Sequence, residues 1–160
     1  MAMGARLRNQ QRRFFCLTSD GELNEGSVWE AALFISHQKL TNVIWLIDRN
    51  GLQGIGRTED VIALEPLDEK LRSFGFHVTH ADGHDFDSLL AAQRECIEQS
   101  DIRRIPAVII CKTTKGRGLG MLQDTVDCHY LPLTDDQYNQ ALTDLEVNYR
   151  KVMQGVIRES

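Results

Sequence analysis

Proline and long apolar runs are both scarce in this 160-residue sequence. The three prolines, Pro66, Pro106 and Pro132, each lie near an expected element boundary, and no repeat, low-complexity segment or linker is evident. We therefore expect a single domain over residues 1–160. No apolar run approaches the length of a membrane span, and residues 1–6 lack the charged-then-apolar order of a secretion signal. A soluble, cytoplasmic protein that does not bind membranes is expected.

Closely spaced cysteine pairs are missing as well. The four cysteines, Cys16, Cys96, Cys111 and Cys128, show no C-x-x-C spacing, which is the spacing of many thiolate metal and redox sites. Cys16 and Cys111 lie inside apolar runs, where a small buried thiol packs well. This cysteine usage fits a reducing cytosol.

The histidines form no zinc motif. His37, His77, His80 and His84 lack the spacing of zinc ligands, and His77 and His80 should point to opposite sides of a strand. His84 is expected to organise a strand-to-helix turn. The glycine-rich run at 116–120 follows a predicted strand but opens no evident helix, which argues against a nicotinamide-binding fingerprint.

Positive charge is in deficit. The 18 Lys and Arg residues are outnumbered by 23 Asp and Glu residues, and the formal net charge of −5 argues against a nucleic-acid-binding surface. The one basic stretch, Arg6, Arg8, Arg12 and Arg13, is interpreted as the solvated end of a helix rather than a binding patch. With 42% hydrophobic and 26% charged residues, the composition is that of a globular domain rather than a disordered chain.

Short apolar runs alternate with helical patterns along the chain. Four runs rich in β-branched or aromatic residues are predicted to be strands: Phe14–Thr18, Val43–Ile47, Phe76–His80 and Ala107–Cys111. The second and fourth are continuously apolar, as expected for strands covered on both faces. Between them, residues 27–38 are apolar nearly all round, which indicates a buried helix, and residues 86–97 follow a one-faced helical period. The alternation predicts an α/β fold, a doubly wound parallel sheet with helices on both faces.

A last helix is predicted after Thr134, where Thr134-Asp135-Asp136-Gln137 forms a capping-box pattern. Its apolar stripe comprises Tyr138, Ala141, Leu142, Leu145, Tyr149, Val152, Met153 and Val156. We interpret the stripe as packing on its own domain, with a subunit interface as the alternative.

Two polar residues follow the first two predicted strands. Asp20 and Asn50 would bring a carboxylate and a carboxamide oxygen together past the carboxyl ends of parallel strands, where open α/β sheets bind ligands. Such oxygens suit Mg²⁺ or Ca²⁺ better than zinc or copper. Gly21 lets the backbone approach an anion, and a helix beginning near Gly26 can point its amino end at a phosphate. The pattern predicts a metal–diphosphate site, and the alternative is that both residues are ordinary strand-end caps.

Asp20-Gly21 followed by Asn50 also resembles the signature of thiamine-diphosphate enzymes. The stretch Asp48–Val61 narrows the resemblance to the transketolase family, in particular the split bacterial form whose amino-terminal subunit carries the diphosphate-binding domain. Further matching segments are Glu25–Gly26, Trp29–Ala31, Asp82–Asp85, and Lys112–Gly118 followed by His129. The resemblance covers the chain from its start to about residue 150.

The resemblance implies specific site residues. The implied metal ligands are Asp20, Asn50 and the backbone carbonyl of Leu52, for Mg²⁺ or Ca²⁺. The implied contacts of thiamine diphosphate are Asp20, Gly21, Glu22, Asn50, Lys115 and His129.

Two residues are implied to be catalytic. Glu25 matches an acidic residue of the family's proton network between paired active sites, although a glutamate at a helix amino end needs no such role. His129 matches a histidine that approaches the diphosphate and the sugar. The loop at 116–131 would close over the site on glycine hinges.

Three departures from the family pattern affect these expectations. Ser19 stands where the family's Gly-Asp-Gly has its first glycine, and its Cβ is expected to disfavour a positive φ or to crowd the diphosphate. Tyr130 stands where a glycine usually follows the histidine. The early histidine motifs, the glycine-rich turn and the first strand of the family domain have no counterpart. We therefore expect an incomplete domain, either truncated or completed by another chain.

The resemblance implies transfer of a two-carbon ketol unit between sugar phosphates. A pyrimidine-binding, carboxy-terminal transketolase subunit would be the partner, in a homo- or hetero-oligomer. One alternative is another thiamine-diphosphate activity, such as a 2-oxo acid decarboxylating subunit or a ketol transferase of secondary metabolism. The other is a non-catalytic remnant retained for the association of subunits. Because a sheet without its flanking elements exposes apolar surface, the lone chain is expected to self-associate or to require a partner.

Overall fold

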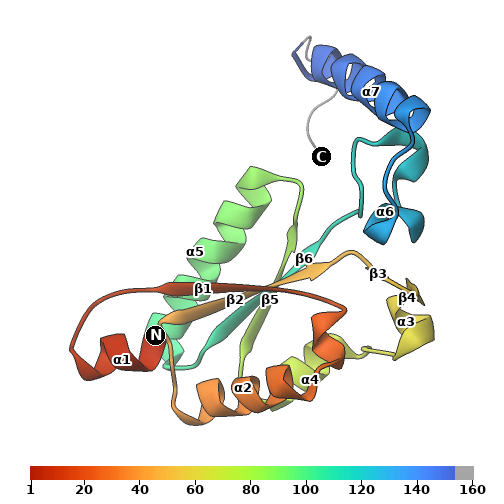
Figure 1. Ribbon diagram of the computed structural model, residues 1–160. Coiled ribbons are helices and arrows are strands. Elements are labelled where there is room, and N and C mark those ends of the chain that lie inside the picture. The colour runs from red at the N-terminus through yellow and green to blue at the C-terminus, as the bar shows by residue number, and fades with distance from the viewer. Residues whose placement is uncertain (154–160) are drawn as a thin grey trace.

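Four parallel strands form the centre of the computed structural model, which describes residues 1–153 and the side chains up to Arg150 (Figure 1). The strands are β1 Phe14–Ser19, β2 Val43–Arg49, β5 His77–Asp82 and β6 Ala107–Lys112. Their order across the sheet is β1-β2-β6-β5. All four predicted strands are confirmed, and β5 begins at His77 rather than at Phe76.

Helices and short elements occupy the connections. The helices are α1 Ala2–Leu7, α2 Gly26–His37, α3 Thr58–Val61, α4 Leu67–Ser73, α5 Phe86–Arg103, α6 Asp127–Tyr130 and α7 Asp135–Met153. The short elements are two 3-10 turns, η1 Glu22–Asn24 and η2 Gly120–Leu122, and an antiparallel ribbon of β3 Leu52–Gln53 and β4 Gly56–Arg57. None of the helices within residues 1–153 is both long and apolar enough to cross a membrane.

The helices cover both faces because the connections change direction across the sheet. The chain passes from β1 through α2 to β2, and then through α4 to β5, always toward the same edge. It returns through α5 to β6, which lies between β2 and β5. Right-handed crossovers therefore place α2 and α4 on one face and α5 on the other, as Figure 1 shows. The predicted doubly wound α/β sheet is confirmed.

The two faces are filled by alternate residues of the same strands. Trp45 and Ile47 of β2 pack in a core cluster with residues of α2 and α4, whereas Ile44 packs with Ala92 and Cys96 of α5. Successive strand side chains point to opposite faces, so a strand covered on both sides must be apolar throughout. This accounts for the continuous apolar runs in β2 and β6.

The β1 edge of the sheet and the outer side of α2 expose apolar side chains. Phe15 and Leu17 of β1 are 54% and 68% exposed, and Leu33 and Phe34 of α2 are 57% and 51% exposed. The prediction that α2 is buried all round is wrong, because only its inner side packs on the sheet. Cys16 is also exposed rather than buried, and it lies on β1, the edge strand of the sheet.

These exposed apolar side chains, Phe15 and Leu17 on β1 and Leu33 and Phe34 on α2, lead to a prediction about association. Covering them would stabilise a complex by roughly 25 cal/mol per Å² of apolar area. We expect sedimentation velocity at micromolar concentration to show species larger than the monomer, and Phe34→Glu to shift the chain toward the monomer. The matched control is Ile55→Glu, which changes a side chain that is 84% exposed in the β3–β4 ribbon turn. A compact, stable monomer of the unmodified chain would contradict the prediction.

Burial separates the thiols into two classes. Cys96 and Cys111 lie in the core, where burial raises the pKa of Cys96 to about 12 and that of Cys111 to about 11. Because the thiolate is the reactive form, both should resist alkylation in the folded protein at mildly alkaline pH, whereas the exposed Cys16 should react. Mass spectrometry after brief iodoacetamide treatment measures this. Rapid modification of Cys96 without unfolding is the contrary result.

The basic stretch near the start is only partly helical. Helix α1 ends at Leu7, and Asn9 takes a positive φ of 53°, which directs the chain out of the helix. Arg13 therefore lies just before β1, where its Nη2 pairs with Asp101 Oδ2 of α5 at 2.8 Å. The interpretation of all four arginines as one helix end is wrong, since Arg6 alone of them lies in α1.

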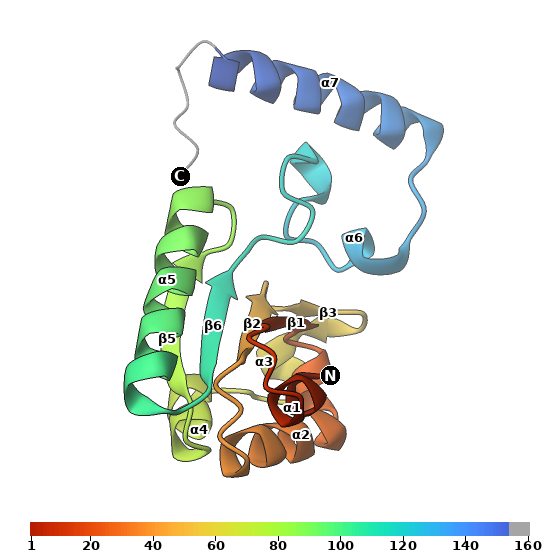
Figure 2. The ribbon, with the colours of Figure 1, turned by 90° about the vertical axis from the view of Figure 1, so that its left-hand side faces the viewer.

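Helix α7 begins with the predicted capping box. Gln137 N donates to Thr134 Oγ1 at 3.2 Å, and Thr134 N donates to Gln137 Oε1 at 2.9 Å. The helix stands beyond the carboxyl ends of the strands, away from the sheet (Figure 2). Ala141 is buried and Leu145 lies against Gly118 of the loop after β6, which agrees with packing on the chain's own domain. Tyr138, Leu142 and Tyr149 are exposed, so that interpretation is wrong for them. The side chains of Val152 and Met153, and Val156 as a whole, lie outside the described residues.

Candidate functional site

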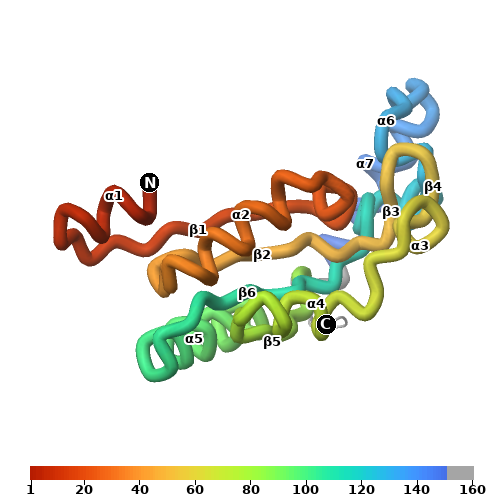
Figure 3. The backbone as a smooth tube through the Cα atoms, turned by 90° about the horizontal axis from the view of Figure 1, so that it is seen from below, coloured from red at the N-terminus to blue at the C-terminus, as the bar shows by residue number. Residues whose placement is uncertain are grey.

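Parallel pairing brings the two predicted metal ligands together. In the register of β1 with β2, Ser19 lies opposite Asp48, and Asp20 N donates to Asp48 O at 3.1 Å. Asp20 is therefore adjacent to the turn that carries Asn50. Figure 3 shows the β3–β4 ribbon, α3 and α6 gathered at this same end of the strands, with α1 toward the other end.

One cavity of about 360 Å³ collects most of the predicted site residues. Its lining is Ser19, Gly21, Glu22, Glu25, Asn50, Leu52, Gln53, Gly54, Lys115 and His129. Side chains from the end of β1, the turn after β2 and the loop after β6 thus meet in one place. Asp20 does not line the cavity, because it is fully buried between two residues that do.

The two carboxylate oxygens of Asp20 have different surroundings. Oδ2 accepts hydrogen bonds from Gly51 N at 2.6 Å and from Arg49 Nη1 at 3.0 Å. Oδ1 is buried without a hydrogen-bond partner in the structure. Since buried carboxylate oxygens in native proteins are paired with a donor or an ion, Oδ1 fits a cation next to the cavity.

Asn50 and Leu52 form a local turn at the cavity wall. Asn50 Oδ1 accepts from Leu52 N at 2.9 Å, and Asn50 Nδ2 donates to Asp48 Oδ1 at 3.3 Å. A carbonyl oxygen has a second lone pair, so Asn50 Oδ1 can still reach a cation. No group of three His, Cys, Asp or Glu suited to a metal occurs in the part of the chain that the structure describes. One carboxylate with neutral oxygens is the donor set that Mg²⁺ uses when phosphate oxygens and water complete its shell.

The turn after β1 accommodates Ser19 without strain. Ser19 N donates to Glu22 Oε2 at 2.8 Å, and Glu22 N donates to Ser19 Oγ at 3.4 Å, which stabilises the start of η1. Among residues 1–153, the non-glycine residues with positive φ do not include Ser19, so the expectation that its Cβ opposes a positive φ is wrong. Gly21 has a φ of −62°, and an added Cβ would make ordinary contacts with Gln53 and Ser19. Glycine is thus not required here by backbone conformation.

The loop after β6 reaches across the cavity and carries His129. A Cβ at Gly54 would lie 3.7 Å from Cε1 and Nδ1 of the His129 ring, so α6 meets the β3–β4 turn directly. The loop is fixed to β4 by Arg57, which donates to both carboxylate oxygens of Asp124 at 3.0 and 2.9 Å. These hydrogen bonds, with the charge of Arg57, hold the pKa of Asp124 below its usual range. Gly116 has a φ of 68°, and a Cβ there would lie 2.5 Å from Cys128 Sγ, so the path needs glycine.

Three histidines occupy the positions that the pattern predicted. His77 Nε2 lies 2.8 Å from Glu95 on α5 and His80 Nε2 lies 2.8 Å from Asp68 on α4, so the two rings point to opposite faces. His84 organises the turn after β5, and its Nε2 accepts from Thr114 N at 2.7 Å. This contact fixes the start of the loop that carries Lys115.

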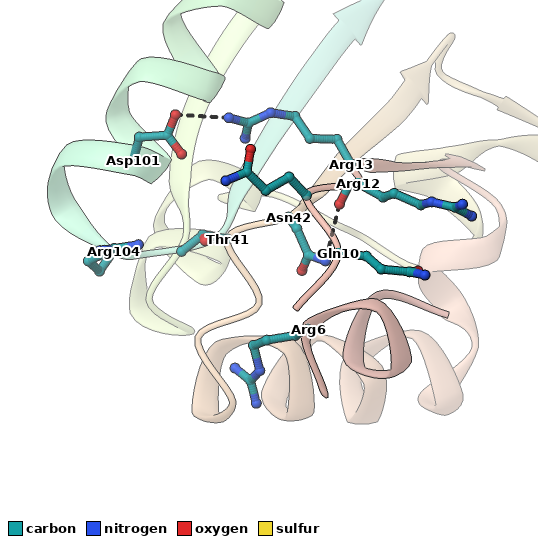
Figure 4. Close-up of a pocket in the computed structure, with 9 residues that line it drawn as sticks. Arg6, Gln10, Arg12, Arg13, Thr41, Asn42, Asp101 and Arg104 are labelled. Atoms are coloured by element: carbon teal, nitrogen blue, oxygen red, sulfur yellow. Dashed lines mark hydrogen bonds and ion pairs between the residues drawn. The ribbon is translucent and has the colours of Figure 1, made fainter. Parts of the chain in front are cut away.

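A second cavity, of about 560 Å³, lies at the opposite end of the strands and is lined by four arginines (Figure 4). The guanidinium groups of Arg6, Arg12 and Arg104 lie apart around it, and Arg13 is paired with Asp101. Ligand sites place a few polar groups so that they converge. The 360 Å³ cavity at the carboxyl ends of the strands meets this description, and we take it as the candidate site.

Comparison with known proteins identifies the domain. Residues 7–157 match the family described as transketolase, thiamine diphosphate binding domain. The chain belongs to this family. Among solved structures, a transketolase from Campylobacter jejuni aligns with a TM-score of 0.81 and 26% sequence identity, over 91% of this chain and 23% of that protein.

The chain is similar to part of longer transketolase proteins. It is 36% identical over 146 residues to an apulose-4-phosphate transketolase subunit of Actinobacillus succinogenes, covering 91% of this chain and 51% of the relative. It is 33% identical over 147 residues to a 6-deoxy-6-sulfo-D-fructose transketolase subunit of a Clostridium species, covering 91% of this chain and 52% of the relative. The chain therefore spans about half the length of these two relatives.

Three residues of this transketolase domain that line the cavity or contact Asp20 lie in the family-like stretch Asp48–Val61, but the sequence did not single them out as site residues. Gln53 and Gly54 line the cavity from the β3–β4 ribbon, whose strands of two residues each are too short for a period. Arg49 bonds to Asp20, but its position in the sequence does not say which way its side chain points. Gln53 Nε2 is buried without a hydrogen-bond partner in the structure, which leaves a donor beside Gly21 for an anionic ligand.

Proposed function

We propose that this chain binds thiamine diphosphate through Mg²⁺ or Ca²⁺ and, with a pyrimidine-binding partner subunit, transfers a two-carbon ketol unit between sugar phosphates. The family supplies the coarser part of this statement, a thiamine-diphosphate-binding transketolase domain. The observation that carries the finer part is the cavity that gathers Gly21, Glu25, Asn50, Lys115 and His129 beside the unpartnered Asp20 Oδ1.

Each group has a chemical task in this proposal. Asp20, Asn50 and the Leu52 carbonyl would hold the cation, which in turn binds the diphosphate of the cofactor. The Lys115 ammonium adds positive charge beside phosphate oxygens, and charge-assisted hydrogen bonds of this kind are about twice as strong as neutral ones. When bound, the cofactor would supply a nucleophilic carbon and, in its thiazolium ring, an electron sink. The protein positions the cofactor and shields it from water.

His129 and Glu25 are the proposed proton-handling groups. His129 lies against Gly54 on the far wall of the cavity, where its ring can donate to a phosphate or a sugar hydroxyl. Glu25 immediately precedes α2, and its side chain makes no capping hydrogen bond to that helix. Its carboxylate is therefore not engaged as a helix cap, and it is available to share a proton with a neighbouring site.

A partner subunit is part of the proposal. Two relatives are named as subunits of transketolases, and this chain spans about half of their length. The exposed apolar side chains of β1 and of α2 offer places for association with further protein. The same side chains favour the second candidate, a non-catalytic chain that acts in the association of subunits.

Reconstitution tests the proposal. The chain should be combined with a pyrimidine-binding transketolase subunit, thiamine diphosphate and Mg²⁺, and assayed with ketose phosphate donors and aldose phosphate acceptors. Transfer of a two-carbon unit supports the proposal, and turnover of 2-oxo acids instead would assign a different thiamine-diphosphate activity. A stable complex that binds no cofactor would leave the association of subunits as the function. Glu25→Gln is the informative variant, because it keeps the shape of the side chain while it removes the proton acceptor.

A further inference from the structure

Arg49 connects the proposed metal carboxylate to a loop and a helix on the α4 side of the sheet. Its guanidinium donates from Nη1 to Asp20 Oδ2 at 3.0 Å, and from Nη2 to Glu59 at 2.5 Å and Glu65 at 3.2 Å. The Arg49 side chain is only 16% exposed. One guanidinium thus joins the end of β1, helix α3 and the segment before α4.

The two glutamates are themselves held in place. Glu59 accepts hydrogen bonds from the backbone amides of Leu64 and Glu65 at 3.3 and 3.4 Å. Glu65 Oε2 accepts from Leu67 N at 2.9 Å, at the start of α4. The Arg49 guanidinium is therefore held in place by two carboxylates, of Glu59 and Glu65, in addition to that of Asp20.

This arrangement decides which oxygen of Asp20 is left for a ligand. Arg49 and the Gly51 amide both bond to Oδ2, and Oδ1 has no hydrogen-bond partner. A carboxylate without these donors could turn and exchange its two oxygens. The guanidinium and the Gly51 amide together remove that freedom before any cation arrives.

We propose that Arg49 is a positioning residue for the metal, which holds Asp20 so that Oδ1 alone faces the cation. This inference rests on the proposed function, since it requires Asp20 to bind the metal of the cofactor. Partners that orient a metal ligand are worth about 10- to 100-fold in metal affinity. The positive charge of Arg49 by itself would repel the cation, so positioning and charge predict opposite results when the guanidinium is removed.

Calorimetry of the full chain with thiamine diphosphate, over a range of Mg²⁺ concentrations, tests this. Arg49→Met should raise the Mg²⁺ concentration needed for half-saturation by about tenfold. Arg49→Lys keeps the charge, but its single nitrogen cannot bond to Asp20 and both glutamates as the guanidinium does. Its Mg²⁺ concentration for half-saturation should therefore lie between those of Arg49→Met and the unmodified chain. The matched control is Arg13→Met, which removes an equal charge that pairs with Asp101 at the opposite end of the sheet and should change this Mg²⁺ concentration less than about twofold.

Two further readouts separate positioning from a general loss of structure. At saturating Mg²⁺ the cofactor affinity of Arg49→Met should return close to that of the unmodified chain, whereas a distorted site would bind weakly at every Mg²⁺ concentration. Glu59→Gln should weaken Mg²⁺ binding, and it should have no added effect in the Arg49→Met background. Equal or tighter Mg²⁺ binding by Arg49→Met overturns the inference. If the unmodified chain itself shows no Mg²⁺-dependent binding, with or without a partner, the proposed function fails together with it.

Discussion

Replacing Asp20 with alanine is expected to abolish Mg²⁺-dependent binding of thiamine diphosphate. Asp20 is the one acidic residue among the three proposed metal ligands, and a cation held by a single carboxylate loses most of its attraction when that carboxylate is removed. Calorimetry should detect no binding by Asp20→Ala under conditions in which the unmodified chain saturates. Unchanged affinity would remove Asp20 from the site.

A second variant separates binding from folding at this position. Asp20→Ala leaves Arg49 and the Gly51 amide without their shared acceptor, which is destabilising in a buried place. Asp20→Asn keeps an oxygen for these donors and removes the negative charge, so it should fold and still fail to bind the metal. The matched control is Asp101→Asn, which neutralises a carboxylate at the opposite end of the sheet and should bind normally.

Replacing His129 with alanine is expected to slow turnover while leaving the fold intact. The ring lies at the cavity wall on the short helix α6, outside the core clusters, so its removal costs little packing. In a reconstituted complex the variant should lose on the order of tenfold or more in ketol transfer or in donor-sugar affinity, the scale of one charge-assisted contact. Its melting temperature should change by less than about 2 °C.

The neighbouring residue supplies the control for His129. Tyr130 lies on the same helix, is 62% exposed and does not line the cavity. Tyr130→Ala should therefore leave transfer near its original rate, although both variants shorten an aromatic side chain on α6. If His129→Ala unfolds early while the surviving molecules turn over normally, His129 is a structural residue and the role given to the loop after Lys115 is wrong.

The sequence predicts those parts of the fold that depend on residues close together in the chain or on the pairing of adjacent strands. Strand β2 is apolar at successive positions because both its faces are covered, and this pattern needs no knowledge of the neighbours. The meeting of Asp20 with Asn50 follows from parallel pairing of adjacent strands at their carboxyl ends. The capping box of α7 is likewise local, because Thr134 and Gln137 satisfy each other.

The errors arise where the answer depends on groups distant in the sequence. The apolar residues on all sides of α2 predict a helix that is covered on every side. The sequence does not show that Leu33 and Phe34 have no covering element within residues 1–153. The expectation of strain at Ser19 came from the family's glycine pattern alone. The hydrogen bonds between Ser19 and Glu22 depend on side-chain geometry, which that pattern does not give. Arg49 was missed because its glutamate partners come from the four-residue helix α3 and the segment before α4, which are too short to show a sequence period.

The central claim is that this chain holds thiamine diphosphate through a divalent cation, and titration calorimetry tests it most directly. Thiamine diphosphate should be titrated into the chain, alone and with a pyrimidine-binding subunit, first in Mg²⁺ and then in excess EDTA. The account predicts saturable binding in Mg²⁺ that disappears in EDTA and returns when Mg²⁺ or Ca²⁺ is restored. Equal binding with and without the cation, or no binding under any of these conditions, would contradict it.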